Sequence, residues 1–242
     1  MKTVLITGGS RGIGLGCVEL FYKQGYSIIN LDIIKPEVDR GLFIQVDLSK
    51  VVNIVDAFEK IAKETKTIDV LVSNSGIHYS ASIENTSEEE FDRVHDVNFK
   101  SAFFVIKEVL KFMKKTGGRI ITIGSDQVFI AKPTSAIYGA TKSAIGQLTK
   151  SIALDYSKYN IIANCICAGT IETPLYWEAI DKHSKNKDIE LQKIHEDEGE
   201  MQLLGRIGKV EEVASLAFYL ANEAGDFLQG AMIPIDGGYT AQ

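Results

Sequence analysis

The chain has 242 residues, of which 45% are hydrophobic and 24% are charged, and its formal net charge is −6. This length and composition exclude intrinsic disorder and a collagen-like chain, and such a chain buries about 70% of its unfolded surface without a disulfide or metal. The acidic balance argues against a nucleic-acid partner, because nucleic acid favours clustered Lys and Arg.

The same sequence gives no sign of a membrane protein or of a secreted one. No apolar stretch approaches the roughly 20 residues that cross a bilayer, and the apolar run Thr3–Thr7 is too short for the core of a signal peptide. The three cysteines, Cys17, Cys165 and Cys167, cannot all pair, and their spacing is not a usual metal-binding one. We therefore expect no metal site, and buried, reduced thiols in a cytoplasmic protein.

Short apolar runs alternate with helical patterns along the whole chain. The predicted strands are Thr3–Thr7, Ser27–Asp32, Leu42–Asp47, Asp69–Ser73, Arg119–Ile123, Ile161–Cys167 and Met232–Ile235. Most are continuous apolar runs, typical of strands covered on both faces, and Pro234 favours an edge position for the last strand. The predicted helices are Ile13–Gln24, Val51–Glu64, Ser87–Phe99, Ala102–Lys115, Ala136–Tyr156 and Val210–Asn222. The alternation predicts an α/β fold: one Rossmann-type domain over residues 1–242, with a doubly wound, parallel, seven-stranded sheet and helices on both faces.

Two segments break this rhythm. The stretch between Asp32 and Asp47 contains Pro36 and the third strand, so it leaves room only for a short loop and not for a crossover helix. Residues 173–205 carry mixed charges and a weak helical pattern. An insertion of this size after a strand end is where we expect a mobile lid over the ligand crevice.

The charges of this lid do not indicate a docking site for an acyl carrier or a metal. Its acidic side chains outnumber its lysines, so it is typical of a solvated surface; the lysines are Lys182, Lys185, Lys187 and Lys193. His183 and His195 are twelve residues apart and lack a carboxylate-bearing zinc motif.

A glycine-rich turn follows the first predicted strand and opens the first helix. Its glycines Gly8, Gly12 and Gly14 permit a tight turn and close approach of a ligand to the backbone. The unpaired N–H groups of the following helix can bind a pyrophosphate. Such a turn alone can be only a turn, but its strand–turn–helix setting favours a dinucleotide site.

Asp32 ends the second predicted strand, 18 residues after Gly14. A carboxylate at this place can accept hydrogen bonds from the adenosine ribose and repels a 2′-phosphate, although it could also simply cap the loop. Arg11 in the glycine turn could instead bind that phosphate. Asp32 has the more discriminating position, so NAD is the preferred cofactor and NADP remains possible.

Three polar residues indicate proton transfer near this site. Ser125 ends the fifth predicted strand, where ligand-facing residues of an open α/β sheet belong. Tyr138 and Lys142 are four apart on a predicted helix and therefore share a face. The ammonium would lower the pKa of the phenol, which can then exchange a proton with an alcohol or carbonyl oxygen. Amphipathic helices often produce such a Tyr–Lys pair by chance, but here it lies downstream of a nucleotide turn.

Taken together, these motifs resemble the classical short-chain dehydrogenase/reductases over essentially the whole chain. The matching segments are Thr7–Gly14, Asn74-Ser75-Gly76, Val97-Asn98, the Ser125, Tyr138 and Lys142 set, Ala168–Thr170, Thr173-Pro174 and Asp236-Gly237-Gly238. The family more often has Ala at position 75 and Pro at position 168. The second departure loosens the turn before the lid.

The resemblance implies a role for each matching residue. Tyr138 would be the general acid/base, Ser125 would hold the substrate oxygen, Lys142 would bind the nicotinamide ribose and bias Tyr138, and Asn98 would hold a water of the proton relay. Asp47 would contact adenine, and Thr173 the carboxamide or phosphates. The implied cofactor-binding set is Gly8, Ser10, Arg11, Gly12, Ile13, Gly14, Asp32, Asp47, Leu48, Asn74, Ser75, Gly76, Tyr138, Lys142, Gly169, Thr170, Ile171 and Thr173.

We therefore expect an oxidoreductase that transfers a hydride between a nicotinamide cofactor and an alcohol or carbonyl carbon. Four segments resemble aldose 1-dehydrogenases: the short loop after Asp32, and residues 151–156, 170–175 and 206–209. This favours a sugar or another polar secondary alcohol as the small-molecule substrate. The alternative is a 3-oxoacyl-thioester reductase acting on an acyl carrier protein. Candidate substrate contacts, besides Ser125 and Tyr138, are Gln127, His78 and Trp177; each could equally be an ordinary loop, surface or packing residue.

Two other classes fit less well. A non-catalytic nucleotide sensor would not need the proton relay, and an extended-branch epimerase would space its first two turn glycines three apart, where this chain has Arg11. Helices 102–115 and 136–156 carry apolar residues on more than one side. With the family likeness, this predicts a homodimer or a homotetramer.

Overall fold

The computed structural model describes residues 1–185 and 188–242 in full; Asn186 and Lys187 are described only as part of a helix, so the side chain of the lid residue Lys187 lies outside it. Seven parallel strands form one sheet in the order β3-β2-β1-β4-β5-β6-β7. Their bounds are β1 Thr3–Thr7, β2 Ser27–Asp32, β3 Gly41–Gln45, β4 Val70–Ser73, β5 Gly118–Ile123, β6 Ile161–Ala168 and β7 Met232–Ile235.

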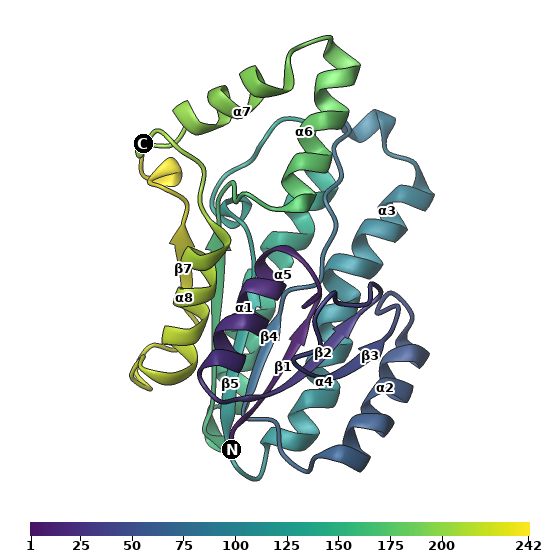
Figure 1. Cartoon of the computed structure of the whole chain (residues 1–242), viewed down its shortest axis with the longest axis vertical. Helices are drawn as coiled ribbons and strands as arrows, with labels where there is room; N and C mark the ends of the chain where they lie inside the picture. The colour runs from purple at the N-terminus through teal and green to yellow at the C-terminus, as the bar shows by residue number, and fades with distance from the viewer.

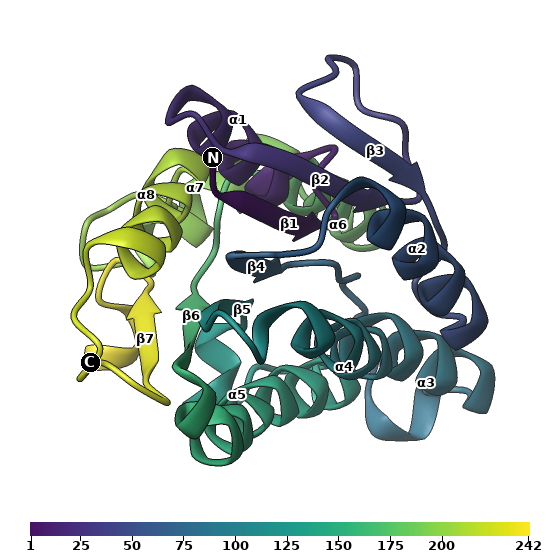
Figure 2. The ribbon, with the colours of Figure 1, turned by 90° about the horizontal axis from the view of Figure 1, so that it is seen from below.

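Helices cover both faces of this sheet, as Figure 2 shows from below. Their bounds are α1 Gly12–Lys23, α2 Val51–Glu64, α3 Glu88–His95, α4 Ser101–Met113, α5 Ala136–Tyr156, α6 Pro174–Lys187, α7 Leu191–Glu200 and α8 Val210–Asn222. One apolar core packs α2, α4 and α5 against the sheet, and a second packs α1 and α8 against the opposite face. Since both faces are buried, the strands carry continuous apolar runs rather than an alternating pattern.

The predicted fold class is confirmed, and most element bounds agree to within two residues. Pro234 lies in β7, which is an edge strand as predicted. The connection from β2 to β3 spans residues 33–40 and contains no helix, as its length required. One helix differs: the predicted helix Ser87–Phe99 is α3 followed by a π-helical turn over Asp96–Lys100, which leads directly into α4.

The segment 173–205 is more regular than its weak helical pattern indicated. It forms two helices, α6 and α7, which stand beyond the carboxyl ends of the strands at the top of Figure 1. Thr173 caps α6 by accepting a hydrogen bond from the Tyr176 N–H, Pro174 occupies the first turn, and Asp188 ends the helix in the left-handed conformation at φ 54°. Local capping thus defines a helix that the charge pattern concealed.

The three thiols are buried and unpaired, as predicted. Cys165 and Cys167 lie on one face of β6 with their Sγ atoms 3.9 Å apart. Within the described part of the chain, no helix combines the length and hydrophobicity needed to cross a membrane. Nor does that part contain a group of three His, Cys, Asp or Glu side chains able to hold a metal ion.

Candidate active site

The strand order reverses direction between β1 and β4, and hydrogen bonds join the carboxyl ends of these two strands. Thr7 Oγ1 accepts hydrogen bonds from the N–H groups of Asn74 and Ser75, at 2.9 and 3.1 Å. In return, the Asn74 side-chain amide donates to the carbonyl oxygens of Thr7 and Gly8, both at 3.1 Å. Ligands of open α/β sheets bind outside the carboxyl ends of the strands at such a point.

The glycine turn between β1 and α1 leaves a cradle that side chains would fill. Gly8 and Gly12 have positive φ values of 66° and 55°. A Cβ on Gly14 would collide with the carbonyl oxygen of Gly8, and one on Gly12 would lie 3.3 Å from Cγ2 of Thr173. The Arg11 side chain makes no capping hydrogen bond to α1, so it leaves the first-turn N–H groups, including that of Ile13, available to a ligand. This backbone arrangement fits a dinucleotide pyrophosphate.

Asp32 caps the loop at the end of β2. Its Oδ2 accepts from the Ser10 N–H at 2.9 Å and its Oδ1 from the Ile34 N–H at 3.0 Å. Ser10 also donates through Oγ to the carbonyl oxygen of Ile34 at 2.6 Å. The carboxylate therefore joins the glycine turn to the strand end. Each of its oxygens keeps a lone pair that a ribose hydroxyl could use.

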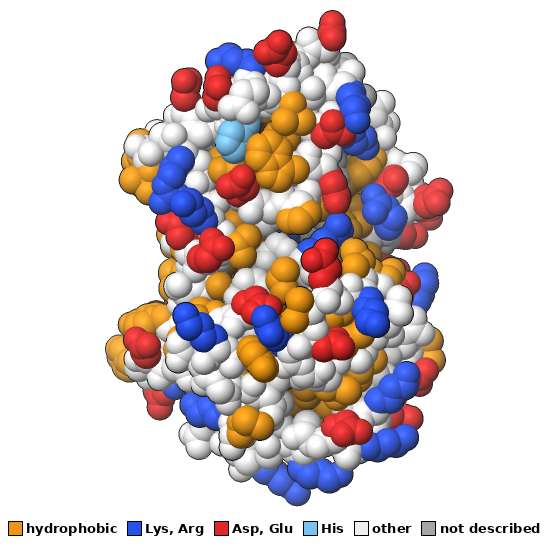
Figure 3. Space-filling view, viewed as in Figure 1, with side chains coloured by type: hydrophobic (Ala, Val, Ile, Leu, Met, Phe, Trp, Pro, Cys, Tyr) orange, Lys and Arg blue, Asp and Glu red, His pale blue; other side chains and the backbone are white. Residues whose placement is uncertain are grey.

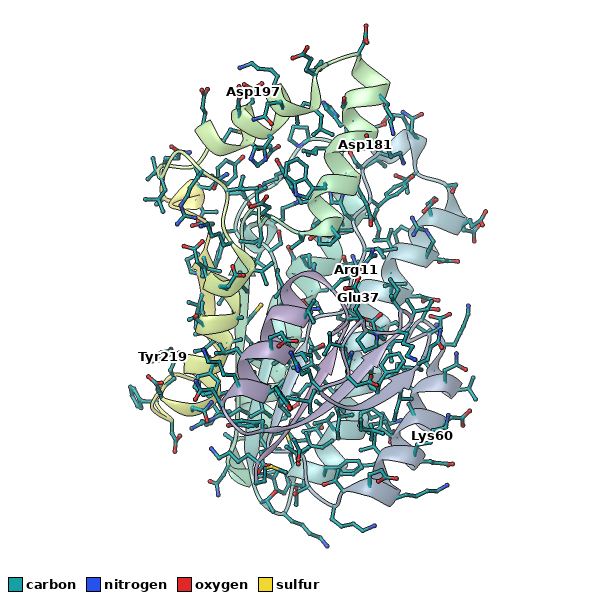
Figure 4. All side chains as sticks on the ribbon, in the orientation of Figure 1. Arg11, Glu37, Lys60, Asp181, Asp197 and Tyr219 are labelled. Carbon is teal, nitrogen blue, oxygen red and sulfur yellow. The ribbon has the colours of Figure 1, made fainter. Side chains whose placement is uncertain are left out.

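Arg11 points from the glycine turn toward the lid. Its Nη1 lies 2.9 Å from Oε1 of Glu178 on α6, and both side chains are exposed. Figure 4 shows the labelled Arg11 beneath α6. The basic side chain in the turn is therefore already paired with a carboxylate.

The other implied cofactor residues lie along the same edge of the sheet. Asp47 follows β3 and accepts from the Ser49 N–H at 2.9 Å, while the neighbouring Leu48 is buried. Four more of these residues lie between the end of β6 and the start of α6: Gly169, Thr170, Ile171 and Thr173. Ile171 pairs with Gly208 in an isolated β-bridge. These residues therefore lie along the carboxyl edge of the sheet, from the end of β3 to the end of β6.

Ser125, Tyr138 and Lys142 meet at the end of β5. Lys142 Nζ lies 5.8 Å from the centroid of the Tyr138 ring and donates to the carbonyl oxygen of Ile123 at 2.9 Å. The pKa of Tyr138 is raised to about 12, mainly because burial disfavours the charged phenolate. The negative charge of Asp126 adds to this rise, and hydrogen bonding with the Ser125 hydroxyl opposes it.

This pKa direction corrects the expectation that Lys142 draws the phenol toward neutrality. In this structure burial of the phenol and the negative charge of Asp126 together raise its pKa. Burial also lowers the pKa of Lys142, to about 8, against the opposing influence of the thiols Cys165 and Cys167. The lysine holds its position through a backbone carbonyl and the tyrosine ring, not through a carboxylate.

Asn98 lies in the π-helical turn and fixes the loop after β4. Its Oδ1 accepts from the Ile77 N–H at 2.8 Å, and its Nδ2 donates to the Ile77 carbonyl oxygen at 3.0 Å and to Thr141 Oγ1 at 3.3 Å. A Cβ on the neighbouring Gly76 would lie 3.3 Å from Asn98 Oδ1 and 3.6 Å from Lys142 Nζ. The π turn, a frequent mark of functional sites, therefore brings Asn98 beside Lys142.

The three candidate substrate residues differ in position. The ring of His78 meets that of Tyr138 edge-on, with centroids 5.1 Å apart. Gln127 is buried, and its Oε1 would lie 2.8 Å from a Cβ on Gly139 of α5. Trp177 stacks on His195 at 4.9 Å within the lid. His78 is thus next to the reactive phenol, Gln127 lies against α5, and Trp177 packs α6 on α7.

The sequence analysis missed one pair of charged residues beside Ser125. Asp126 is only 1% exposed, and its Oδ1 accepts the Ser125 hydroxyl proton at 2.8 Å. Its Oδ2 lies 2.6 Å from Nζ of Lys132 without the alignment of a hydrogen bond. The available signal was a carboxylate placed directly after a strand-end serine.

Comparisons with known proteins agree with this geometry. Residues 8–240 match the family model described as "Enoyl-(Acyl carrier protein) reductase". The chain is 34% identical over 256 residues to a D-beta-hydroxybutyrate dehydrogenase of Rhizobium meliloti, covering 100% of this chain and 99% of that protein. The chain belongs to the short-chain dehydrogenase/reductase family.

Two solved structures superpose along the full length of this chain. A short chain dehydrogenase family protein from Francisella tularensis is 38% identical with a TM-score of 0.95, and each chain is covered completely. The ligand-free aldohexose dehydrogenase of Thermoplasma acidophilum is 33% identical with a TM-score of 0.94, covering 100% of this chain and 94% of that one. The protein is accordingly an oxidoreductase that transfers a hydride between a nicotinamide cofactor and an alcohol or carbonyl carbon.

Proposed function

We propose that this protein is an NAD-dependent dehydrogenase of a sugar or another small, polar secondary alcohol. The observation that carries the proposal is the meeting of Ser125, Tyr138 and Lys142 at the end of β5, with Asn98 adjacent. All four positions carry a side chain that can hold or move a proton.

The four side chains divide the work between them. A nicotinamide held by the glycine turn and Lys142 would supply the hydride acceptor or donor. Tyr138 takes the hydroxyl proton of the alcohol through its phenol oxygen, or returns it to a carbonyl. Ser125 hydrogen-bonds the same substrate oxygen, and the ammonium of Lys142 stabilises the phenolate and holds the cofactor ribose. Asn98 keeps the loop after β4 beside Lys142 and would hold the water that continues the relay.

The preference for NAD over NADP rests on the end of β2. The carboxylate of Asp32 would repel a 2′-phosphate, and Arg11, the cation that could attract one, is paired with Glu178. A related protein from Listeria innocua, 32% identical over 99% of this chain, is named an NAD-dependent glycerol dehydrogenase. The solved relative ElxO, 29% identical, has NADP bound, so the family accommodates both cofactors.

The alternative substrate is a 3-oxoacyl group on an acyl carrier protein. The 3-oxoacyl-[acyl-carrier-protein] reductase of Thermotoga maritima is 34% identical over 98% of this chain. Acyl carriers are acidic and need a basic docking surface. Acidic and basic side chains alternate over the upper part of the molecule in Figure 3. Two lid lysines, Lys185 and Lys193, are paired with the acids Asp181 and Asp197. This pattern favours a small substrate.

A cofactor and substrate screen tests the proposal. The full chain is assayed with NAD and with NADP against sugars, polyols, hydroxy acids and 3-hydroxyacyl thioesters, and nicotinamide absorbance reports turnover. We expect activity with NAD on members of the first three groups. Turnover confined to the thioesters, with NADP, would replace this proposal by the alternative.

We infer further that the protein acts as a homodimer or homotetramer in the cytoplasm. Phe103 on α4 and Leu154 on α5 are 45% and 81% exposed, which is unfavourable unless another surface covers them. The buried, reduced thiols are compatible with a reducing compartment. Light scattering at micromolar concentration should give at least twice the 26.6 kDa chain mass, and a strict monomer would contradict this inference.

A further inference from the structure

The hydroxyl of Ser135 is a buried polar group at the edge of the candidate active site. Two buried side-chain atoms of the described residues make no hydrogen bond, Asp126 Oδ2 and Ser135 Oγ. The first lies 2.6 Å from Lys132 Nζ, so an ion pair compensates it. Ser135 is only 6% exposed, and its hydroxyl is left without a partner in the described part of the chain. Leaving a buried hydroxyl unpaired costs free energy, which a ligand that bonds to it recovers.

Ser135 stands at the start of α5, on the helix face that carries the reactive residues. It immediately precedes the helix, and Tyr138 and Lys142 follow three and seven positions later, so the three share one face. The loop after β4 covers this face at two points. The ring of His78 meets that of Tyr138 edge-on, with centroids 5.1 Å apart, and Ala81 forms a β-bridge with Ser135. The Ser135 hydroxyl therefore lies under the same loop that borders the phenol.

The backbone before Ser135 is held in an unusual conformation. Thr134 has a φ of 54°, a left-handed value that β-branched residues rarely adopt. Its carbonyl oxygen accepts from the Ala81 N–H at 2.8 Å, and its Oγ1 lies 2.7 Å from Ser80 Oγ, so the loop after β4 restrains it. Thr134 and Ala136 are exposed, whereas Ser135 between them is buried. The strained turn thus directs the serine side chain inward, and such strain is often found at functional sites.

The surroundings of Ser135 favour a negative charge. Helix α5 has 21 residues, the Ser135 side chain does not cap its first turn, and no acidic residue lies in that turn, so the positive end of the helix dipole is left open. Burial and the charges of Lys132 and Lys182 lower the pKa of the His78 ring, so the field of both lysines reaches the neighbourhood of the phenol. Asp126 balances Lys132, whereas Lys182 is an exposed residue of the lid. An anionic group of the substrate would therefore be stabilised here.

We propose that Ser135 is a specificity-determining residue whose hydroxyl donates a hydrogen bond to a carboxylate of the substrate, so that the site selects small hydroxy acids over neutral alcohols. This rests on the proposed function, in which Tyr138 exchanges the proton of the substrate hydroxyl. The carboxylate binds at the start of α5, while the hydroxyl of the same small molecule lies at the phenol. The Ser135 hydroxyl gains a charged acceptor, and the carboxylate lies at the positive end of the helix dipole.

The variant Ser135→Ala, made in the full chain, tests the hydroxyl alone. Because this side chain caps no N–H group and makes no hydrogen bond, the Tm of the variant should equal or exceed that of the unmodified chain. The control is Ser151→Ala, which removes a hydroxyl from the other half of α5, where it donates to the Gln147 carbonyl oxygen at 3.2 Å. A Tm several degrees lower in Ser135→Ala would indicate a structural role and overturn the proposal.

The first readout is steady-state kinetics with acids and their amides, which differ in charge but little in shape. The probes are both enantiomers of 3-hydroxybutyrate and of lactate, each with its amide, and NAD is the co-substrate. We expect the unmodified chain to prefer at least one acid over its amide by about 10-fold in kcat/KM. Ser135→Ala should raise KM for that acid about 10-fold with kcat within about 3-fold, and change kcat/KM for the amide by less than about 3-fold. Equal losses on acid and amide, or no loss on the acid, would overturn the proposal.

The second readout is binding without turnover. Butyrate and butyramide carry no hydroxyl to oxidise, and each is titrated against the chain with bound NADH, whose fluorescence reports binding. Butyrate should bind more tightly than butyramide, and Ser135→Ala should weaken butyrate binding about 10-fold and butyramide binding by less than about 3-fold. An equal effect on both ligands, or none on butyrate, would contradict the carboxylate contact.

The two readouts separate this proposal from the proposed function. Oxidation of sugars and polyols without oxidation of any hydroxy acid would overturn the role of Ser135 and leave the proposed function standing. If the unmodified chain oxidises no alcohol of any class, the proposed function fails, and the titration of butyrate against butyramide still decides whether Ser135 binds a carboxylate.

Discussion

Lys142 donates a hydrogen bond from its Nζ to the carbonyl oxygen of Ile123, 2.9 Å away at the end of β5. The lysine is buried, and no carboxylate accepts from its ammonium among the hydrogen bonds of the described residues. A neutral carbonyl compensates only part of the cost of removing the charge from water, which explains why burial lowers its pKa to about 8.

This pKa makes the stability of the protein depend on pH. Between about pH 8 and 10.5 the unfolded chain binds more protons at Lys142 than the folded chain, so the free energy of unfolding should rise with pH over this range. The substitution Lys142→Met removes this titrating group and with it the pH dependence that it causes. Urea unfolding at pH 7.5 and 9.5 should show the unmodified chain gaining about 1–3 kcal/mol relative to the variant. An equal pH dependence in both would contradict the lowered pKa.

Replacing Tyr138 by Phe tests the proton donor directly. The variant keeps the ring that contacts His78 and lies over Lys142, so the site should retain its shape. We expect kcat to fall about 10²–10⁴-fold because the transferable proton is lost, while the dissociation constant of NADH stays within about 2-fold. Stopped-flow kinetics and fluorescence titration measure the two quantities. Retained turnover would exclude the phenol as the acid/base.

Asp32→Asn should change cofactor selection. The amide still fills the end of β2 but loses the charge that repels a 2′-phosphate, and one of its bonds to the Ser10 and Ile34 N–H groups is lost. NAD binding should weaken about 10-fold, while NADP binding weakens less or improves. The matched control is Glu37→Gln, which removes a charge from the same loop at an exposed position. A similar shift in both variants would mean that the discrimination lies elsewhere.

One added methyl group at Gly14 should block the proposed cofactor site in the glycine turn. In Gly14→Ala the new Cβ would collide with the carbonyl oxygen of Gly8, so the turn must open. We expect loss of NADH fluorescence enhancement and a fall in Tm of several degrees. Gly225→Ala is the control, because no atom lies within 4 Å of its added Cβ. If Gly14→Ala binds cofactor normally, the turn is not the pyrophosphate site.

Most of the fold could be predicted from the sequence because its signals are local. The continuous apolar runs of the strands and the glycine turn before α1 follow from the burial of both sheet faces and from backbone geometry. The helices of the lid could not be predicted in this way: α6 depends on capping by Thr173, and its sequence mixes apolar and charged residues without a clear stripe. The π-helical turn around Asn98 carries no periodicity that distinguishes it from an α-helix.

The residues of the candidate site could be predicted from the sequence, but their pKa values could not. Ser125, Tyr138 and Lys142 follow from strand ends and helix spacing. The pKa of the phenol depends on how much water the neighbouring elements exclude and on the charge of Asp126, which are tertiary properties. Asp32 caps the loop through Ser10 and Ile34, which the sequence offered only as an alternative to a cofactor contact and could not decide.

The helices α6 and α7 enter the chain between β6 and α8, whereas the residues around the phenol come from β5, α5 and the π-helical turn. The lid helices and the groups around the phenol therefore come from separate stretches of polypeptide. Residues 174–200 can be exchanged as one segment without altering the residues that surround the phenol. Grafting this segment from a homologue would measure directly how much α6 and α7 contribute to the choice of alcohol.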